Sequence, residues 1–152
     1  MIRRIDEGPG VRKEDNMTKD KTPPAILIEV GPGELIDKIT ILVIKSERMS
    51  DEGKLKNVRH ELDVLNAARV AHIPASAELT RLEADLKKVN EDLWVIEDDI
   101  RQCEADRDFG QTFIDLARSV YKQNDKRAAL KKEVNLLTGS TIIEEKSYTE
   151  FS

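Results

Sequence analysis

The sequence is poor in cysteine and has no long apolar run, and each deficit excludes a class of protein. Its 152 residues include one cysteine, Cys103, so an internal disulfide and a cysteine-based zinc site are excluded. A single cysteine fits a reducing compartment, and we expect a cytoplasmic protein. The apolar runs are too short to span a membrane, and no secretory signal is visible at the N-terminus. The net charge of −5 argues against nucleic acid as a partner.

Sequence motifs for chemistry are also missing. The chain has no phosphate-binding loop, no zinc-protease motif, no CxxC and no nucleophile elbow. His60 and His72 each lack a second ligand at helical spacing, so we expect no metal and no cofactor. The glycines at 31 and 33 precede the acidic Glu34, which favours a plain turn over a phosphate site. These absences favour a non-enzymatic protein and leave an enzyme as the alternative.

Charged residues make up 36% of the chain and aromatic residues only 4%, a composition typical of disorder or of long amphipathic helices. Hydrophobic periodicity favours helices. We predict helices over residues 34–49, 51–70 and 111–137, and a helix of about 30 residues after Ser76. That third helix carries a heptad stripe: Leu79, Leu82, Leu86, Val89, Leu93, Ile96, Ile100 and Cys103.

The expected fold class is all-α. Short connections make neighbouring helices antiparallel, so the third and fourth helices should form a long coiled-coil-like hairpin, with the two shorter helices packed on it. The first helix is apolar around most of its circumference, which predicts that it is buried against several neighbours.

The two ends of the chain predict less regular structure. Residues 1–24 are expected to form a disordered leader, with Met17 as a candidate true start. Residues 25–148 are expected to form a single helical domain, followed by a tail at 149–152. The run AILIEV at 25–30, between prolines and Gly-Pro-Gly, predicts a short β-strand, which would pair with residues 141–148 and join the chain ends.

Polar residues on three of the predicted helices form stripes that should face other parts of the protein. Because buried charges are costly unless they are paired, these stripes should either meet one another or surround a ligand. Closed pairing would fix the register of the helices. An open pocket would offer arginines to a carboxylate or phosphate. The candidate ligand-binding residues are Asp37, Thr40, Glu47, Arg48, Asn90, Trp94, Glu97, Arg101, Arg118, Tyr121, Asn124 and Arg127.

Four segments carry a resemblance to a known family: GELIDKITILVIKSERM, NEDLWVIEDDIR, FIDLARSVYKQNDKRAALK and EEKSY. Together they resemble a bacterial family of small proteins that is described as a domain of unknown function. The resemblance covers about Ile26 to Tyr148 and implies no particular activity.

The first predicted helix also resembles part of the first helix of all-helical chorismate mutases, through Ile36, Asp37, Ile39, Leu42 and Arg48. That resemblance implies that Arg48 holds a substrate carboxylate. The sequence departs from the mutase pattern in two ways. The arginine expected just ahead of Ile36 is absent, and the helix is far too short.

Two functions follow from these patterns. The first is a non-enzymatic scaffold or protein-binding module, as a homodimer or with another protein, which the heptad stripe and the lack of catalytic motifs favour. The alternative is a binding protein or enzyme with a basic pocket for an anionic small molecule between the first, third and fourth helices.

Overall fold

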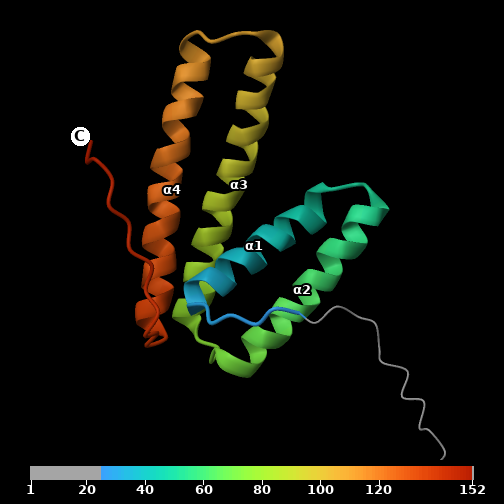
Figure 1. The fold of residues 1–152 in the computed structure, drawn as a ribbon, viewed down its shortest axis with the longest axis vertical. Helices are drawn as coiled ribbons and strands as arrows, with labels where there is room; N and C mark the ends of the chain where they lie inside the picture. The colour runs from blue at the N-terminus through green and yellow to red at the C-terminus, as the bar shows by residue number, and fades with distance from the viewer. Residues whose placement is uncertain (1–24, 152) are drawn as a thin grey trace, which may run out of the picture.

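The computed structural model describes residues 25–151 and contains four helices in that range. They are α1 (Pro32–Arg48), α2 (Glu52–His72), α3 (Ala77–Asp106) and α4 (Gln111–Leu137), shown in Figure 1. Residues 25–151 contain no β-strand, so the all-α prediction is confirmed for this part of the chain. None of these helices is long and apolar enough to cross a membrane. The predicted leader at 1–24, Met17 included, lies outside the described residues.

The ends of the helices follow from local capping chemistry. Asp51 caps α2 by accepting a hydrogen bond from the backbone N–H of Lys54 at 2.8 Å, and Ser76 caps α3 by accepting from Leu79 at 3.1 Å. After α4, Gly139 adopts a left-handed conformation with φ of 68°. A glycine tolerates that conformation without strain, so it suits the chain reversal that follows a helix.

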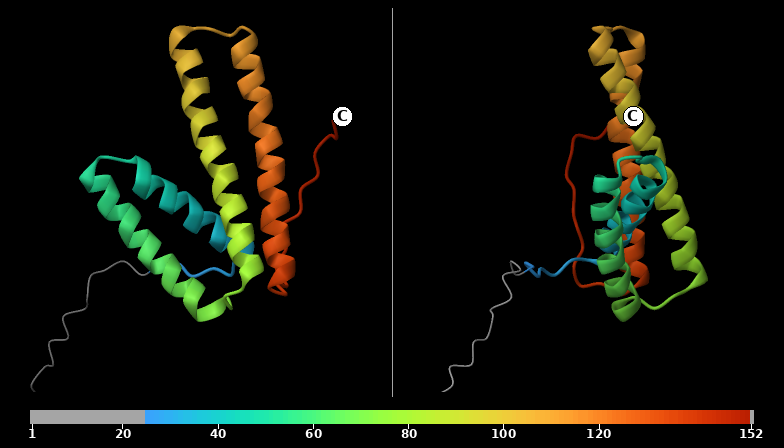
Figure 2. Two further views of the ribbon diagram at one scale, coloured as in Figure 1. Left: turned by 180° about the vertical axis from the view of Figure 1, so that it is seen from behind. Right: turned by 90° about the vertical axis from the view of Figure 1, so that its right-hand side faces the viewer.

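Helix α1 lies at the centre of the fold and contacts all three other helices. In Figures 1 and 2, α3 and α4 run antiparallel side by side. Helices α1 and α2 form a second, shorter helix pair, and α1 of this pair packs against the lower half of α3 and α4. Ile36, Ile39 and Ile44 of α1 are fully or almost fully buried. The expectation that this helix is the buried one is confirmed. The core cluster comprises Leu35, Ile36, Ile39, Ile73, Leu79, Leu82, Leu86 and Val134.

The two segments predicted to pair as β-strands do not form a sheet. Residues 25–30 are extended and exposed, with Leu27 almost entirely in solvent. Residues 141–148 run alongside α4, where Glu144 and Glu145 reach Lys131 and Lys132. Side-chain ion pairs to a helix therefore hold this segment, in place of a backbone ladder. The chain next to the two segments still comes close, since a Cβ on Gly31 would lie 3.0 Å from the carbonyl oxygen of Ile142.

The upper half of the α3–α4 pair extends beyond α1 and α2. We call residues 95–120 the outer arm. Within this arm Cys103 is the only buried residue, whereas the lower half of α3 buries Leu79, Leu82 and Leu86 against the core. Figure 2 shows both helices of the arm standing clear of the α1–α2 pair from two directions. Apart from Cys103, the heptad stripe is therefore only partly buried within the outer arm.

The crossing of α1 and α4 depends on a glycine. A Cβ on Gly33 would overlap the backbone carbonyl oxygen of Lys131 and lie 2.9 Å from its carbonyl carbon. Backbone atoms cannot move aside as a flexible side chain does, so only glycine permits this approach. At the same place the backbone N–H of Gly33 donates to Oδ1 of Asn135 at 2.8 Å.

Gly33→Ala should therefore destabilise the protein by about 2 kcal/mol, the usual scale for overpacking a close contact. Urea denaturation followed by circular dichroism measures this change in the free energy of unfolding. Gly53→Ala is the matched control, because its Cβ would meet only the side chain of Asp51, at 3.3 Å. That variant should be neutral, or more stable by up to about 1 kcal/mol from helix propensity. Equal effects of the two substitutions would contradict this account of the crossing.

Candidate functional site

Four of the predicted site residues meet where α1, α3 and α4 come together. Asp37 of α1 is 1% exposed, and its carboxylate accepts hydrogen bonds from Arg127 Nε at 2.9 Å and Nη2 at 2.5 Å. Asn90 of α3 donates through Nδ2 to Asp37 Oδ1 at 2.9 Å and to Thr40 Oγ1 at 3.0 Å. The Thr40 hydroxyl in turn donates to the backbone carbonyl of Asp37 at 2.8 Å. We call Asp37, Thr40, Asn90 and Arg127 the polar centre.

The α1 residue at the polar centre, Asp37, has its carboxylate fully paired. Both oxygens of the Asp37 carboxylate have donors, and the pair with Arg127 is bidentate, the geometry that suits guanidinium and carboxylate best. The hydrogen bonds that Arg127 donates to Asp37 raise the pKa of Arg127, even though burial acts in the opposite direction. Asp37 is therefore an internal counter-ion, and its own carboxylate is not available to a ligand.

A second ion cluster lies one turn further along α4. The ammonium of Lys131 is 2.6 Å from Glu34 of α1 and 3.0 Å from Glu144 of the C-terminal segment. Burial acts to lower the pKa of Lys131, but the hydrogen bonds that Lys131 donates to these two carboxylates, with their negative charges, outweigh burial, and the pKa is raised. The same contact lowers the pKa of Glu144. Lys131 therefore ties the C-terminal segment to α1 and α4.

Sequence reasoning missed part of this second cluster. Lys131 lies on the same polar stripe as Asn124 and Arg127 but was not counted among the candidate ligand-binding residues, and Asn135, one turn further, could have been added by its spacing alone. Glu34 was considered as the acidic residue that disfavours a phosphate site, and Glu144 lies in a segment that was predicted to pair as a β-strand.

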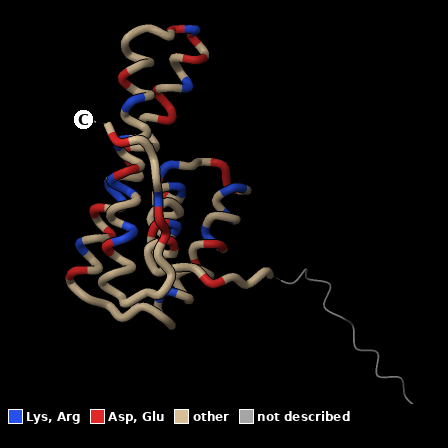
Figure 3. Tube along the Cα trace, turned by 60° about the vertical axis from the view of Figure 1, so that its left-hand side comes forward, with Lys and Arg blue, Asp and Glu red and all other residues tan. Residues whose placement is uncertain are grey.

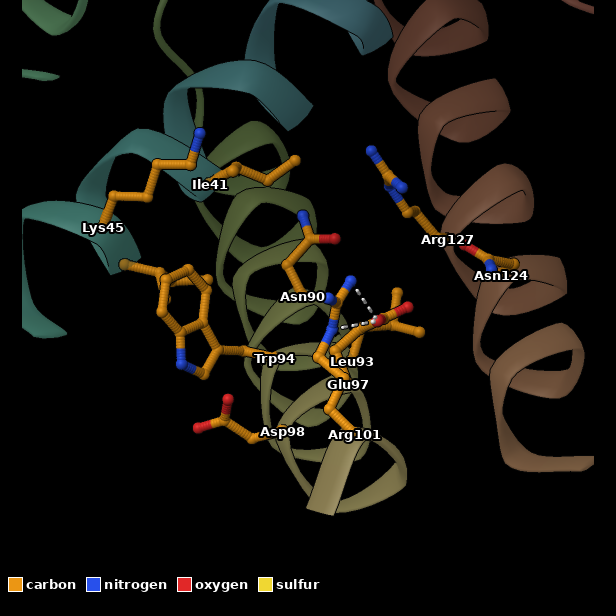
Figure 4. A pocket seen from close by; sticks show the side chains of 11 residues that line it. Ile41, Lys45, Asn90, Leu93, Trp94, Glu97, Asp98, Arg101, Asn124 and Arg127 are labelled. Atoms are coloured by element: carbon orange, nitrogen blue, oxygen red, sulfur yellow. Dashed lines mark hydrogen bonds and ion pairs between the residues drawn. The ribbon is translucent and has the colours of Figure 1, made fainter. Parts of the chain in front are cut away.

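A pocket of about 570 Å³ lies beside the polar centre. Figure 4 shows Trp94 of α3 on one side, Asn124 and Arg127 of α4 on the other, and the Glu97–Arg101 ion pair between them. Lys45, Ile41 and Ile44 of α1 complete its walls together with Leu93 and Asp98. We call this space the central pocket. It brings together six of the predicted residues: Asn90, Trp94, Glu97, Arg101, Asn124 and Arg127.

The remaining candidate residues lie outside the central pocket. Glu47 forms an exposed ion pair with Lys87 at 3.1 Å, and Arg48 is exposed at the end of α1. Arg118 is exposed on the outer arm. Tyr121 packs edge-on against Phe151, with ring centroids 4.9 Å apart. Residues 25–151 contain no group of three or more His, Cys, Asp or Glu side chains that could hold a metal ion.

The fold and this site define a small α-helical protein with a buried ion pair at the crossing of three helices and a pocket beside it. The chain belongs to the family of unknown function DUF6165, whose model matches residues 26–151. No curated protein and no solved structure matches the chain significantly, so the resemblance to chorismate mutases has no support from these comparisons. The position of Arg48 outside the pocket gives the mutase resemblance no structural support either.

Breaking the ion pair at the polar centre should be costly. Arg127→Gln leaves the carboxylate of Asp37 buried without its cation, and removing one partner of a buried pair costs about 3 to 5 kcal/mol. Arg127 keeps 30% of its side chain exposed, so we expect a loss at the lower end, about 3 kcal/mol. In the double variant Asp37→Asn/Arg127→Gln, the loss of unfolding free energy should be smaller than the sum of the losses in the two single variants. The reason is that Asp37→Asn removes the carboxylate charge that Arg127→Gln leaves unpaired. Urea denaturation of the three variants measures this coupling.

Arg101→Gln is the matched control for this double-mutant cycle of Asp37 and Arg127. Its partner Glu97 lies on the same helix, both side chains are more than half exposed, and such pairs contribute below about 1 kcal/mol. Additive losses for Asp37→Asn and Arg127→Gln, or a loss for Arg101→Gln as large as that for Arg127→Gln, would show that the buried pair does not stabilise the crossing.

Proposed function

We propose that this protein is a non-enzymatic scaffold module that associates with a second copy of itself through the outer arm. The observation that supports the proposal is the lack of cover over residues 95–120, where only Cys103 is buried. Helix α1 packs on the lower half of the same helix pair and stabilises it, whereas no segment among residues 25–151 packs on the arm in the same way. A helix pair packed on one side only leaves the edges of its apolar seam in contact with water.

The seam of the outer arm is apolar but only partly covered. Its half-buried members are Leu116, Phe113, Ile96, Ile100 and Val120. Val95 and Ile114 are more exposed, at 45% and 46%, and Phe109 at the tip is 53% exposed. Each square ångström of apolar surface removed from water contributes about 25 cal/mol, so a second helix pair laid along the arm would gain stability. Two arms would then form a four-helix bundle.

The charges of the arm favour a second copy as the partner. Residues 97–106 of α3 contain five carboxylates and one arginine, whereas residues 118–126 of α4 contain Arg118, Lys122 and Lys126 and one carboxylate, Asp125. All of these side chains are exposed, and Figure 3 shows charged residues along both helices. The acidic stretch lies nearer the tip and the basic stretch nearer the base. Two arms that overlap antiparallel about a two-fold axis therefore bring acidic α3 of one copy against basic α4 of the other.

The lone Cys103, buried in the seam, fits the reducing cytoplasm that we also propose as the location. The whole of residues 25–148 would act as one unit, with the α1–α2 pair bracing the base of the arm.

Reversing the charges of two basic residues of α4, Arg118 and Lys122, should break the dimer. In Arg118→Glu/Lys122→Glu, which changes one residue of the arm and one just below it on α4, the acidic α3 of one copy would face acidic side chains on the other, and each like-charge contact opposes association. We expect a dimer for the unchanged protein and a monomer for this variant in sedimentation equilibrium at low salt. Raising the salt should weaken the unchanged dimer, because surface charges are screened beyond about 10 Å at 0.1 M.

Two further variants make this test decisive. Asp98→Lys/Asp99→Lys alone should also give a monomer. Mixing it with the Arg118→Glu/Lys122→Glu protein should restore a heterodimer, because α3 and α4 then carry opposite charges in both halves of the interface. Lys54→Glu/Lys56→Glu reverses two exposed charges on α2, away from the arm, and should leave the dimer intact. A clean monomer for the unchanged protein at all concentrations tested would refute the proposal.

A further inference from the structure

A small cavity with a strongly basic lining lies where the C-terminal segment meets α4. Its volume is about 70 Å³, and it is lined by Asn124, Arg127, Ala128 and Lys131 of α4 and by Lys146. Three of these five residues are cations and none is a carboxylate. Since a water molecule takes about 30 Å³, the space has room for about two waters or for one small oxyanion group. We call it the basic cavity.

The carboxylates that balance these cations stand outside the cavity lining. Asp37 and Glu34 reach Arg127 and Lys131 from α1, and Glu144 reaches Lys131 from the C-terminal segment. Asp37 and Glu34 hold their cations from the α1 side, while the Glu144 carboxylate lies 3.0 Å from Lys131 and 3.6 Å from Lys146 without lining the cavity. The ordering of the cationic groups is therefore achieved by the fold, before any ligand arrives, which lowers the entropic cost of binding.

The cations keep hydrogen-bond donors that these carboxylates do not use. Arg127 engages Asp37 through Nε and Nη2, which leaves donors among the five N–H groups of its guanidinium. The ion pair of Lys146 with Glu144 spans 3.6 Å, which is longer than a hydrogen bond. The side-chain amide of Asn124 adds a further N–H group beside them. An oxyanion placed in the cavity would find donors on several sides.

The basic cavity shares Asn124 and Arg127 with the central pocket. That pocket, at about 570 Å³, is within the range of small-molecule sites, and it is lined by seven polar or charged residues and by four apolar ones, Ile41, Ile44, Leu93 and Trp94. Trp94 offers a flat apolar surface on its far side (Figure 4). The two spaces therefore adjoin at Asn124 and Arg127, and a molecule with an anionic head and an apolar body would extend from one into the other.

We propose that the basic cavity binds the phosphate or carboxylate group of a small organic anion whose apolar body lies in the central pocket beside Trp94. Arg127 holds the head group by the free edge of its guanidinium, while the buried Asp37 fixes the opposite edge. Lys131 and Lys146 supply the remaining positive charge, and the partial exclusion of water strengthens their attraction for the anion. The central pocket shares Glu97, Asp98 and Arg101 with the outer arm, whereas the basic cavity that holds the head group lies outside the arm.

The single tryptophan of the chain allows a direct test, because Trp94 lines the central pocket and its fluorescence reports on that pocket alone. The full chain is titrated with phenyl phosphate, benzoate, inorganic phosphate and the neutral benzyl alcohol. We expect a saturable change of Trp94 emission with phenyl phosphate or benzoate, and the stronger of the two identifies the head group. Inorganic phosphate should bind at least about tenfold more weakly by calorimetry, since it lacks the apolar body. Benzyl alcohol should produce no saturable change.

Variants of two lysines separate the cavity from general surface charge. Lys146→Gln should weaken the better of the two aromatic anions about fivefold or more, with an unchanged melting temperature, because Lys146 lies in the exposed C-terminal segment. Lys132→Gln removes a neighbouring exposed lysine that does not line the cavity, and it should have no effect. The proposal is overturned if neither aromatic anion gives a saturable change. It is equally overturned if the two lysine variants weaken binding to the same extent, or if benzyl alcohol binds as well as the anions.

Discussion

The buried carboxylate of Asp37 is the constraint on which the rest of this structure depends. A charge that is 1% exposed must have a partner, and its partners come from two other helices, Arg127 of α4 and Asn90 of α3. Apolar side chains alone would allow α1 to slide or rotate along the α3–α4 pair at modest cost. The bidentate ion pair permits one register, because any other would leave the carboxylate without its donors.

The other features of the crossing follow from that register. It brings Gly33 against the backbone of Lys131, where no larger residue fits, and it places Asn135 to accept a hydrogen bond from Gly33. It also sets Lys131 between Glu34 and Glu144, so that the C-terminal segment is attached to the same helix pair. One polar contact thus organises three helices and a terminal segment, while the apolar core beside it supplies most of the stabilisation.

The position of α1 also divides the α3–α4 pair into two parts with different properties. The lower half is covered and rigidly paired. The outer arm is left with a partly covered apolar seam and separated charges, which is the basis of the proposed self-association. The central pocket and the basic cavity lie at the boundary, where ion pairs have already ordered the cations. Assembly and ligand binding, as proposed, would meet at Glu97, Asp98 and Arg101, which belong to the arm and also line the central pocket.

The sequence by itself determined the four helices and the burial of α1, because caps at Asp51 and Ser76, the glycine at 139 and the apolar periodicity are local signals. It also identified Asp37, Asn90 and Arg127 as polar residues that needed partners. Only the tertiary structure decided that these three meet, that Glu47 pairs with Lys87 instead, and that residues 141–148 follow α4 rather than a strand. Pairing between side chains 50 to 90 positions apart depends on how the helices are arranged in space, and helical periodicity carries no information about that arrangement.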